Sequence, residues 1–411
     1  MTISPASASR PTDPERIGLA LAGGGFLGVA WEIGALVAIE ESISGLDLTR
    51  MDVYVGVSAG AFIASALANG ISSRRLARIF VEAEAEGPSF DPAGVLRPDL
   101  PEFARAIRHL RGLTRAAVGR GFEDLGAGLS SAGWRTLQRA GSLLPNGIYD
   151  AEPFRSHLAA LFGAAGRTDD FRQLRACLRV VATDIDSAET VAFGEPGHDD
   201  MPISRAVIAS SAVPGLFKPV TIHGRQYVDG ALNKTMHASV ALREGAGLVI
   251  CANPLVPYSS HEPRARRVSS AGLPALLSQS VRTAIHSRMT VGMERYAHTH
   301  PGADIVLFEP HHDDPDIFFT NMFSVSARRR LCEHAYQRTR ADLISRADEL
   351  GAKLARHGLW LDTTVLNDPQ RRLLDPATRR HAGAGALGRA LNTLSHTLDD
   401  LDAGIARWRR G

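Results

Sequence analysis

Apolar positions along the chain fall into short runs typical of buried strands and longer stretches with helical spacing. Residues 17–22 form a first apolar run, glycines occupy 23–25, and a helical pattern extends over about 29–41. A second run at 53–57 leads directly into a short apolar helix at 59–68. Strand, turn and helix twice in succession predict βαβ units with a parallel sheet.

The same rhythm resumes in the second half of the chain. Short apolar runs predict further strands at 178–182, 190–193, 220–222, 226–228, 248–251 and 305–308. Helical spacing at 202–210 and 235–244 places helices between several of them. The fold class is therefore predicted to be α/β.

Two regions depart from this rhythm. Residues 72–147 contain few β-branched residues and many arginines, which predicts a mostly helical insertion. It would form either a covering layer on the sheet or a lid or lipid-contacting surface. Near the C-terminus, apolar residues recur at alternating spacings of four and three: Leu387, Leu391, Leu394, Leu398, Leu401, Ile405 and Trp408. This stripe is compatible with packing on the protein itself, homo-oligomerisation or membrane docking.

These patterns divide the chain into three parts. Residues 1–15 are polar and rich in Pro and Ser, which predicts a disordered arm. Residues 16–310 form the main domain, and residues 311–411 form a mostly helical C-terminal region that ends in the heptad-spaced helix.

Composition narrows the classes of partner and compartment. Basic and acidic residues number 46 and 44, so no overall positive charge favours nucleic acid as a partner. The three cysteines are far apart and odd in number, which argues against a disulfide framework and indicates a reducing compartment. The first residues lack the basic and apolar regions of a secretory signal. We expect a cytoplasmic protein, and peripheral membrane contact remains open.

The sequence GVSAG at 56–60 lies between a predicted strand and a predicted helix. This is the context of a nucleophile elbow, in which a tight turn exposes the serine hydroxyl at a helix N-terminus. Gly56 and Gly60 flank Ser58, where larger side chains would clash. The pattern therefore predicts that Ser58 is a nucleophile.

The glycine-rich sequence at 23–28, GGGFLG, is compatible with two classes of function. Its backbone N–H groups can stabilise an oxyanion. The same letters fit the dinucleotide-binding fingerprint, which requires an acidic residue at the end of the next strand. Here that strand ends in the GVSAG turn, and Asp47 and Asp52 precede it. The dinucleotide fingerprint is therefore incomplete.

Four segments, in this order, resemble the patatin-like phospholipase family over about residues 16–255. They are the glycines at 23–25, the GVSAG turn, the sequence ASSAVPGLF at 209–217, and DGA at 229–231. The resemblance implies a three-layer α/β/α fold, a Ser–Asp dyad without histidine, and hydrolysis of acyl esters of lipids.

By this resemblance Ser58 is the nucleophile and Asp229 is the general base that activates it. The oxyanion hole would be formed by backbone amides of the glycine-rich loop: Gly24, Gly25, Phe26, Leu27 and Gly28. Gly230 supports the turn after Asp229, residues 209–217 would help to place the strand of Asp229, and Asp184 would lie in a turn or cap. No metal and no cofactor is implied, and the partner is a lipid ester substrate.

The chain departs from the family pattern at two positions. Leu27 stands where many members carry a basic residue, and Ala231 replaces the third residue of the usual Asp-Gly-Gly. Neither change removes a reacting group. The first leaves open the level of activity and the charge of the substrate.

Several alternatives remain. A histidine could complete a triad, with His237 and His261 following Asp229, although we expect His237 at a helix start beside the site. The sequence HHDD at 311–314 is predicted to be a solvated loop rather than a metal site, because adjacent side chains diverge. Other classes of function are a dinucleotide-binding protein using Gly23–Gly28 and a catalytically inactive lipid-binding or scaffold protein.

Overall fold

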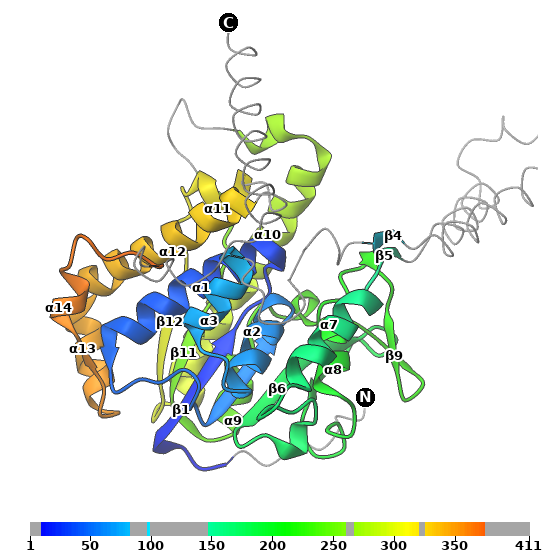
Figure 1. Cartoon of the computed structure of the whole chain (residues 1–411), viewed down its shortest axis with the longest axis horizontal. Helices are drawn as coiled ribbons and strands as arrows, with labels where there is room; N and C mark the ends of the chain where they lie inside the picture. Colours follow the sequence, from blue (N-terminus) through cyan, green and yellow to red (C-terminus); the bar gives the residue numbers. More distant parts are fainter. Residues whose placement is uncertain (1–9, 83–96, 99–146, 260–266, 320–324, 375–411) are drawn as a thin grey trace, which may run out of the picture.

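A computed structural model describes residues 10–82, 97–98, 147–259, 267–319 and 325–374. Its centre is an eight-stranded sheet (Figure 1). The strands are β1 (Asp13–Leu21), β3 (Val53–Val57), β6 (Cys177–Asp184), β7 (Thr190–Phe193), β9 (Val220–Ile222), β10 (Arg225–Asp229), β11 (Ala246–Ala252) and β12 (Asp304–Phe308). Their order is β12-β11-β1-β3-β6-β10-β9, and β7 pairs with β6.

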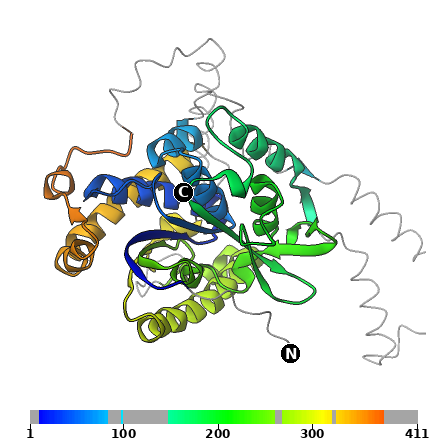
Figure 2. The same cartoon turned by 90° about the horizontal axis from the view of Figure 1, so that it is seen from below.

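The first five strands of this order run parallel, whereas β10 is antiparallel to both β6 and β9. A parallel sheet needs helices on both faces. Helices α1 (Gly25–Ser42), α2 (Ala59–Ala68), α8 (Ile203–Ser210) and α12 (Val325–Ser345) cover one face, and α9 (Ala238–Arg243) and α10 (Leu273–Thr299) cover the other. Figure 2 shows α10 on the side of the sheet opposite α1 and α12.

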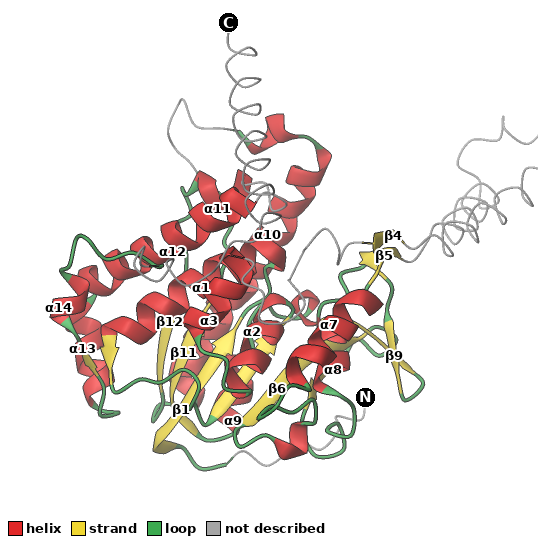
Figure 3. Cartoon of the chain, in the orientation of Figure 1, coloured by secondary structure: helices red, strands yellow, loops and turns green. Residues whose placement is uncertain are grey.

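The alternation of side chains along the strands separates the two cores. In β1, Leu19 packs with α1 and α2, and Ala20 packs with α9 on the opposite face. The residues of α2 are almost all buried, because α2 lies between the sheet and α1 and α8. This explains why its sequence is apolar on every face. The result is a three-layer α/β/α sandwich, visible in Figure 3 as helices on both sides of the strands.

Shorter elements complete the described chain. A first group comprises α7 (Glu152–Phe162), β4 (Arg97–Pro98), β5 (Gly147–Asp150), β8 (Gly215–Phe217) and the 3-10 turn Gly230–Leu232. Elsewhere they are β2 (Ile43–Ser44), α3 (Ser73–Ala77), the π-helix Arg78–Glu82, the 3-10 turns Phe171–Gln173 and Val268–Ala271, α11 (Pro315–Phe319), α13 (Ala347–Ala355), β13 (Trp360–Leu361) and α14 (Thr363–Leu366).

The α/β prediction is confirmed, and each strand predicted from an apolar run is present. The bulk of the predicted insertion, and the apolar stripe from Leu387 to Trp408, lie outside the described residues. Among the helices that the structure describes, none combines the length and the hydropathy needed to cross a bilayer.

Candidate active site

Ser58 lies in the turn between β3 and α2, in a backbone conformation that L-residues rarely adopt. Its φ is 52° and its ψ is −116°. The turn is tight because a Cβ on Gly56 would lie 2.4 Å from the Gly60 carbonyl oxygen, and a Cβ on Gly60 would lie 2.5 Å from the Leu21 carbonyl. The glycines thus allow β1, β3 and α2 to meet around Ser58.

The backbone N–H of Ser58 is held from a distant part of the chain. It donates a hydrogen bond to Oγ of Ser210, the last residue of α8, at 2.8 Å. The Ser210 hydroxyl in turn donates to the Val181 carbonyl at 2.5 Å. Both serines are buried. The elbow is therefore fixed to β6 through the end of α8.

Asp229 reaches Ser58 because two strand ends meet beside β6. The end of β3 pairs Val57 with Val181, and the end of β10 pairs Asp229 with Ala182. The Ser58 hydroxyl lies near enough to the Asp229 carboxylate to favour its ionised form and so to lower its pKa. A Cβ on Gly230 would lie 2.3 Å from the Val181 carbonyl oxygen, so only glycine allows this approach.

The Asp229 carboxylate is buried and only partly compensated. Burial raises its pKa to about 6, while the hydrogen bond from the Ala231 N–H, at 2.8 Å, and the nearby Ser58 hydroxyl act in the opposite direction. Its own backbone N–H donates to the Ala212 carbonyl at 3.0 Å. The segment at 209–217 thus contacts both residues of the pair, through Ser210 and Ala212. A carboxylate with this pKa is suited to accept a proton near neutral pH.

The glycine-rich loop lies against the same pair. A Cβ on Gly23 would lie 3.3 Å from the Ser58 Cβ and 3.2 Å from the Ala231 Cβ. Gly25 has φ +59° and begins α1, so the amides of the first turn lack intrahelical acceptors. The Gly28 amide differs, because it donates to the Gly24 carbonyl at 2.9 Å. The Gly28 amide, predicted from the sequence to be an oxyanion donor, is therefore already engaged within the loop.

A cavity of about 160 Å³ opens beside Ser58. It is lined by Gly25, Phe26, Val29, Ser58, Ala59, Phe62, Ala151, Phe154, Ile208, Ser211, Val213, Leu216 and Phe217. These residues come from the N-terminal turns of α1, α2 and α7, the end of α8, and β8. The candidate nucleophile therefore borders a largely apolar space, as the acyl group of a lipid ester would require.

Other predicted residues have structural surroundings. His237 precedes α9, as expected, and burial lowers its pKa to about 3. Within the described residues, no hydrogen bond joins His237 to Ser58 or Asp229; His261 lies outside them. Asp184 accepts hydrogen bonds from the N–H groups of Asp186 and Ser187, as its predicted role in a turn requires. Leu27 is half-buried against the core.

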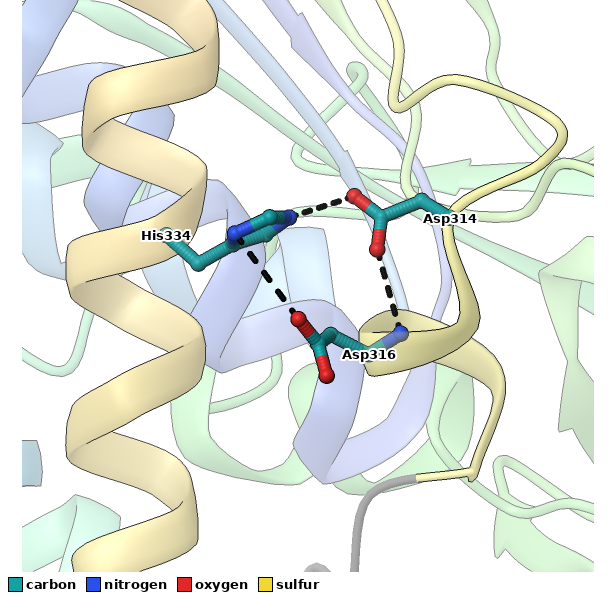
Figure 4. A group of neighbouring side chains, drawn as sticks. All are labelled: Asp314, Asp316 and His334. Atoms are coloured by element: carbon teal, nitrogen blue, oxygen red, sulfur yellow. Dashed lines mark hydrogen bonds and ion pairs between the residues drawn. The ribbon is translucent and has the colours of Figure 1, made fainter.

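The solvated-loop prediction for residues 311–314 is correct for the first three and wrong for Asp314, which is buried. Asp314 accepts the N–H of Asp316 at the start of α11 and lies 2.5 Å from Nε2 of His334 on α12 (Figure 4). The hydrogen bond to Asp314 raises the pKa of His334. Ligand-type atoms of these three residues lie within 4.8 Å of one another. The two nitrogens of the His334 imidazole face different carboxylates. Hydrogen bonds and ion pairs that join the start of α11 to α12 therefore account for the clustering of these three side chains.

A model of the patatin-like phospholipase family matches residues 19–242, more than half of the chain. The chain belongs to the patatin-like phospholipase family. Membership supports lipid acyl hydrolase activity in general terms and agrees with the three-layer fold. The matched range contains the GVSAG turn, the glycine-rich loop and the DGA segment.

Two solved structures show weaker similarity. VipD from Legionella pneumophila is 20% identical, with 84% of this chain and 69% of that chain covered and a TM-score of 0.37. ExoU, in its complex with SpcU from the type III secretion system of Pseudomonas aeruginosa, is 19% identical, with 82% and 52% covered and a TM-score of 0.29. This chain spans about half the length of ExoU.

Sequence reasoning missed the positioning contact of Ser210 and most of the cavity wall. Ser210 falls in the ASSAVPGLF segment, whose resemblance to the family was the one available signal. Phe62, one helical turn after Ser58, could have been identified from its spacing. Phe154 and Ile208 carry no motif, because only the tertiary fold brings them to Ser58.

Proposed function

We propose that this protein is a serine hydrolase that cleaves fatty acyl ester bonds of lipids through Ser58 and Asp229. The observation that carries the proposal is the position of Ser58 beside the buried Asp229 carboxylate, whose pKa it lowers, at the edge of an apolar cavity. Nucleophile and base within hydrogen-bond reach form the arrangement required for covalent catalysis.

In the first step the Asp229 carboxylate takes the proton of the Ser58 hydroxyl while Oγ attacks the ester carbonyl carbon. The carbonyl π-electrons move to oxygen and form a tetrahedral oxyanion. Backbone N–H groups of Gly24–Leu27 would stabilise this charge, aided by the positive N-terminal end of the α1 dipole. The oxyanion collapses, the ester C–O bond breaks, and the leaving alkoxide takes the proton from Asp229.

The second step releases the fatty acid. Asp229 accepts a proton from water, and the hydroxide attacks the acyl-Ser58 carbonyl through a second tetrahedral oxyanion. Ser58 leaves and recovers the proton from Asp229. Ser58, Asp229 and water account for every proton and electron pair, so the scheme uses neither metal nor organic cofactor.

Dinucleotide binding is a weaker candidate for the same loop. In dinucleotide-binding folds, the acidic residue that binds the ribose lies at the carboxyl end of the strand that follows the loop. In this fold Ser58 follows that end of β3, whereas Asp52 precedes Val53 at the opposite end and accepts the Ile17 N–H at 2.9 Å. Thermal stability should therefore remain unchanged when NAD or FAD is added.

The test is labelling of the purified protein with a fluorescent fluorophosphonate, which forms a covalent bond to an activated serine. We expect strong labelling of the wild type and of Ser280→Ala, an exposed serine on α10. Ser58→Ala should abolish labelling and Asp229→Asn should reduce it at least a hundredfold, with both variants folded. An unlabelled wild type, with or without lipid, would instead favour a catalytically inactive lipid-binding or scaffold protein.

We further propose that the protein is cytoplasmic and contacts membranes peripherally. Val213 and Leu216 border the cavity with 36% and 44% of their surfaces exposed, where a lipid surface would lie. Co-sedimentation with phosphatidylcholine vesicles should fall when both are changed to Ser. Sedimentation velocity on the full chain tests whether it forms homo-oligomers.

A further inference from the structure

The cavity beside Ser58 is small and is bounded by core residues, which bears on the substrate. Its wall includes Val29, Ala59, Phe62 and Ile208, each at least 94% buried in the core. Val213 and Leu216, by contrast, are exposed at its opening. The cavity therefore combines a partly exposed rim with a wall of close-packed side chains, and Ser58 is part of its lining.

Two aromatic rings join the helices that form this wall. Phe62 on α2 and Phe154 on α7 lie with ring centroids 6.3 Å apart and planes tilted by 58°. Such tilted pairs are favourable contacts that hold both rings in place. Phe62 is one helical turn from Ser58, so the ring pair lies close to the proposed nucleophile. An acyl chain that occupies the cavity would contact both rings, because both line it.

The polarity of the lining identifies which part of a lipid would enter. Among the described lining residues no side chain is charged, and Ser211 is the only polar one besides Ser58. A phosphate or other charged head group would lose its hydration there without new partners. An alkyl chain would lose only unfavourable contact with water. The cavity thus suits the acyl part of the substrate.

Volume sets the length of that acyl part. An apolar cavity of roughly 150 Å³ holds a benzene ring, which has six carbons. The cavity here, at about 160 Å³, is of the same size. We propose that it is an acyl subsite for about six carbons, closed by Phe62 and Phe154, and that the preferred substrates are esters of short- to medium-chain acyl groups. This inference rests on the proposed function.

The test is kcat/KM for p-nitrophenyl esters with acyl chains of two to sixteen carbons. Each buried methylene should raise kcat/KM about fourfold, up to about six carbons. Longer chains should lose activity, at least tenfold by twelve carbons. Values that keep rising through twelve carbons would overturn the proposal.

Two variants move the limit in opposite directions. Phe154→Ala removes a half-buried ring and should shift the optimum to longer acyl chains by several carbons. Ala151→Leu adds volume to the lining and should shift it to shorter ones. Leu277→Ala, which shortens a side chain of α10 that is 58% exposed, should leave the profile unchanged. An optimum that does not move in either lining variant contradicts the assignment.

A binding measurement separates this inference from the proposed chemistry. Ser58→Ala protein, which cannot form an acyl-enzyme, is titrated with 1-butanol to 1-decanol, and Kd is measured by calorimetry. Kd should fall about fourfold per methylene as far as hexanol and then stop falling. This result would support the subsite even if the wild type hydrolysed no ester. A steady fall through decanol would overturn the subsite, whatever the enzyme's activity.

Discussion

The backbone N–H of Ser58 donates a 2.8 Å hydrogen bond to the hydroxyl of Ser210, 152 residues further along the chain. Ser210 is fully buried, and its own hydrogen is donated to Val181 of β6. The conformation at Ser58 leaves its N–H without a regular partner in the sheet or the helix. Ser210 therefore supplies the acceptor that the elbow needs.

We predict that Ser210→Ala destabilises the protein and slows the reaction. The loss leaves the Ser58 N–H and the Val181 carbonyl without the serine hydroxyl, and a buried unsatisfied group costs about 1–3 kcal/mol. Urea denaturation measures the first effect and kcat the second. Ser280→Ala, on the exposed face of α10, is the matched control and should change neither. Wild-type stability and kcat in Ser210→Ala would show that the contact does not position Ser58.

The pKa of Asp229 predicts the acid limb of the pH profile. As general base, Asp229 must be ionised in the free enzyme, and burial raises its pKa to about 6. The value of kcat/KM should therefore rise tenfold per pH unit below about pH 6 and level off above it. A profile that is flat from pH 4.5 to 8 would contradict the role of Asp229.

Deprotonation of Asp229 should lower the stability of the folded protein over the same pH range in which the activity rises. Its pKa is raised from 3.8 in the ordinary state to about 6, so the folded protein holds the proton more tightly than the unfolded chain does. The stabilising contribution is complete below about pH 4 and is lost as the pH rises through 6. The difference corresponds to roughly 3 kcal/mol. In Asp229→Asn, thermal denaturation should lose this dependence over pH 4–6 and show higher stability than the wild type at pH 8.

Ser58 carries strain that glycine would not. At φ 52° and ψ −116°, a residue with a Cβ costs about 1–3 kcal/mol, part of which is offset by the greater entropy of glycine in the unfolded state. Ser58→Gly should therefore be more stable than Ser58→Ala by about 1 kcal/mol, although both are inactive. Their midpoints in guanidinium chloride give the comparison. Equal midpoints would show that the turn is unstrained.

The elements around Ser58 could be predicted because their signals are local. The predicted strand at 53–57 and the predicted helix at 59–68 match β3 and α2 at every residue. The GVSAG turn separates these two elements, and Gly70 follows shortly after the end of α2. By contrast, β1 begins at Asp13 rather than residue 17, where pairing of Asp13 with Ala246 of β11 overrides a polar sequence.

Much of the candidate site could not be predicted, because its partners are distant in sequence. The contact of Ser58 with Ser210, the ring pair of Phe62 and Phe154, and the pairing of β5 with β8 depend on the assembled fold. The burial of Asp314 could not be predicted for the same reason, since its hydrogen-bond partner His334 is 20 residues further along the chain, on α12. Motifs identified the residues proposed to react, and the side chains that would position them and select the substrate carry no local pattern.

The glycine-rich loop allows a last prediction, because two of its glycines differ in the space around them. A Cβ on Gly24 would lie 2.7 Å from both the Gly28 Cα and the Pro254 Cγ, closer than real Cβ atoms approach other atoms. A Cβ on Gly28 would lie 3.1 Å from the Pro254 Cγ, which a small shift of the proline ring can relieve. Alanine at Gly24 must therefore displace the loop, and alanine at Gly28 need not.

If the amides of this loop hold the oxyanion, Gly24→Ala should lower kcat about a hundredfold, since displacements near 1 Å have effects of that size. Its KM should change little, because the cavity wall is formed mainly by other elements. Gly28→Ala should lower kcat less than tenfold. Gly292→Ala, with no atom within 4 Å of its Cβ on α10, should keep full activity and gain about 0.5–1 kcal/mol of stability. Equal losses in Gly24→Ala and Gly28→Ala, or a loss confined to KM, would argue that the loop shapes the entrance to the cavity instead of stabilising the oxyanion.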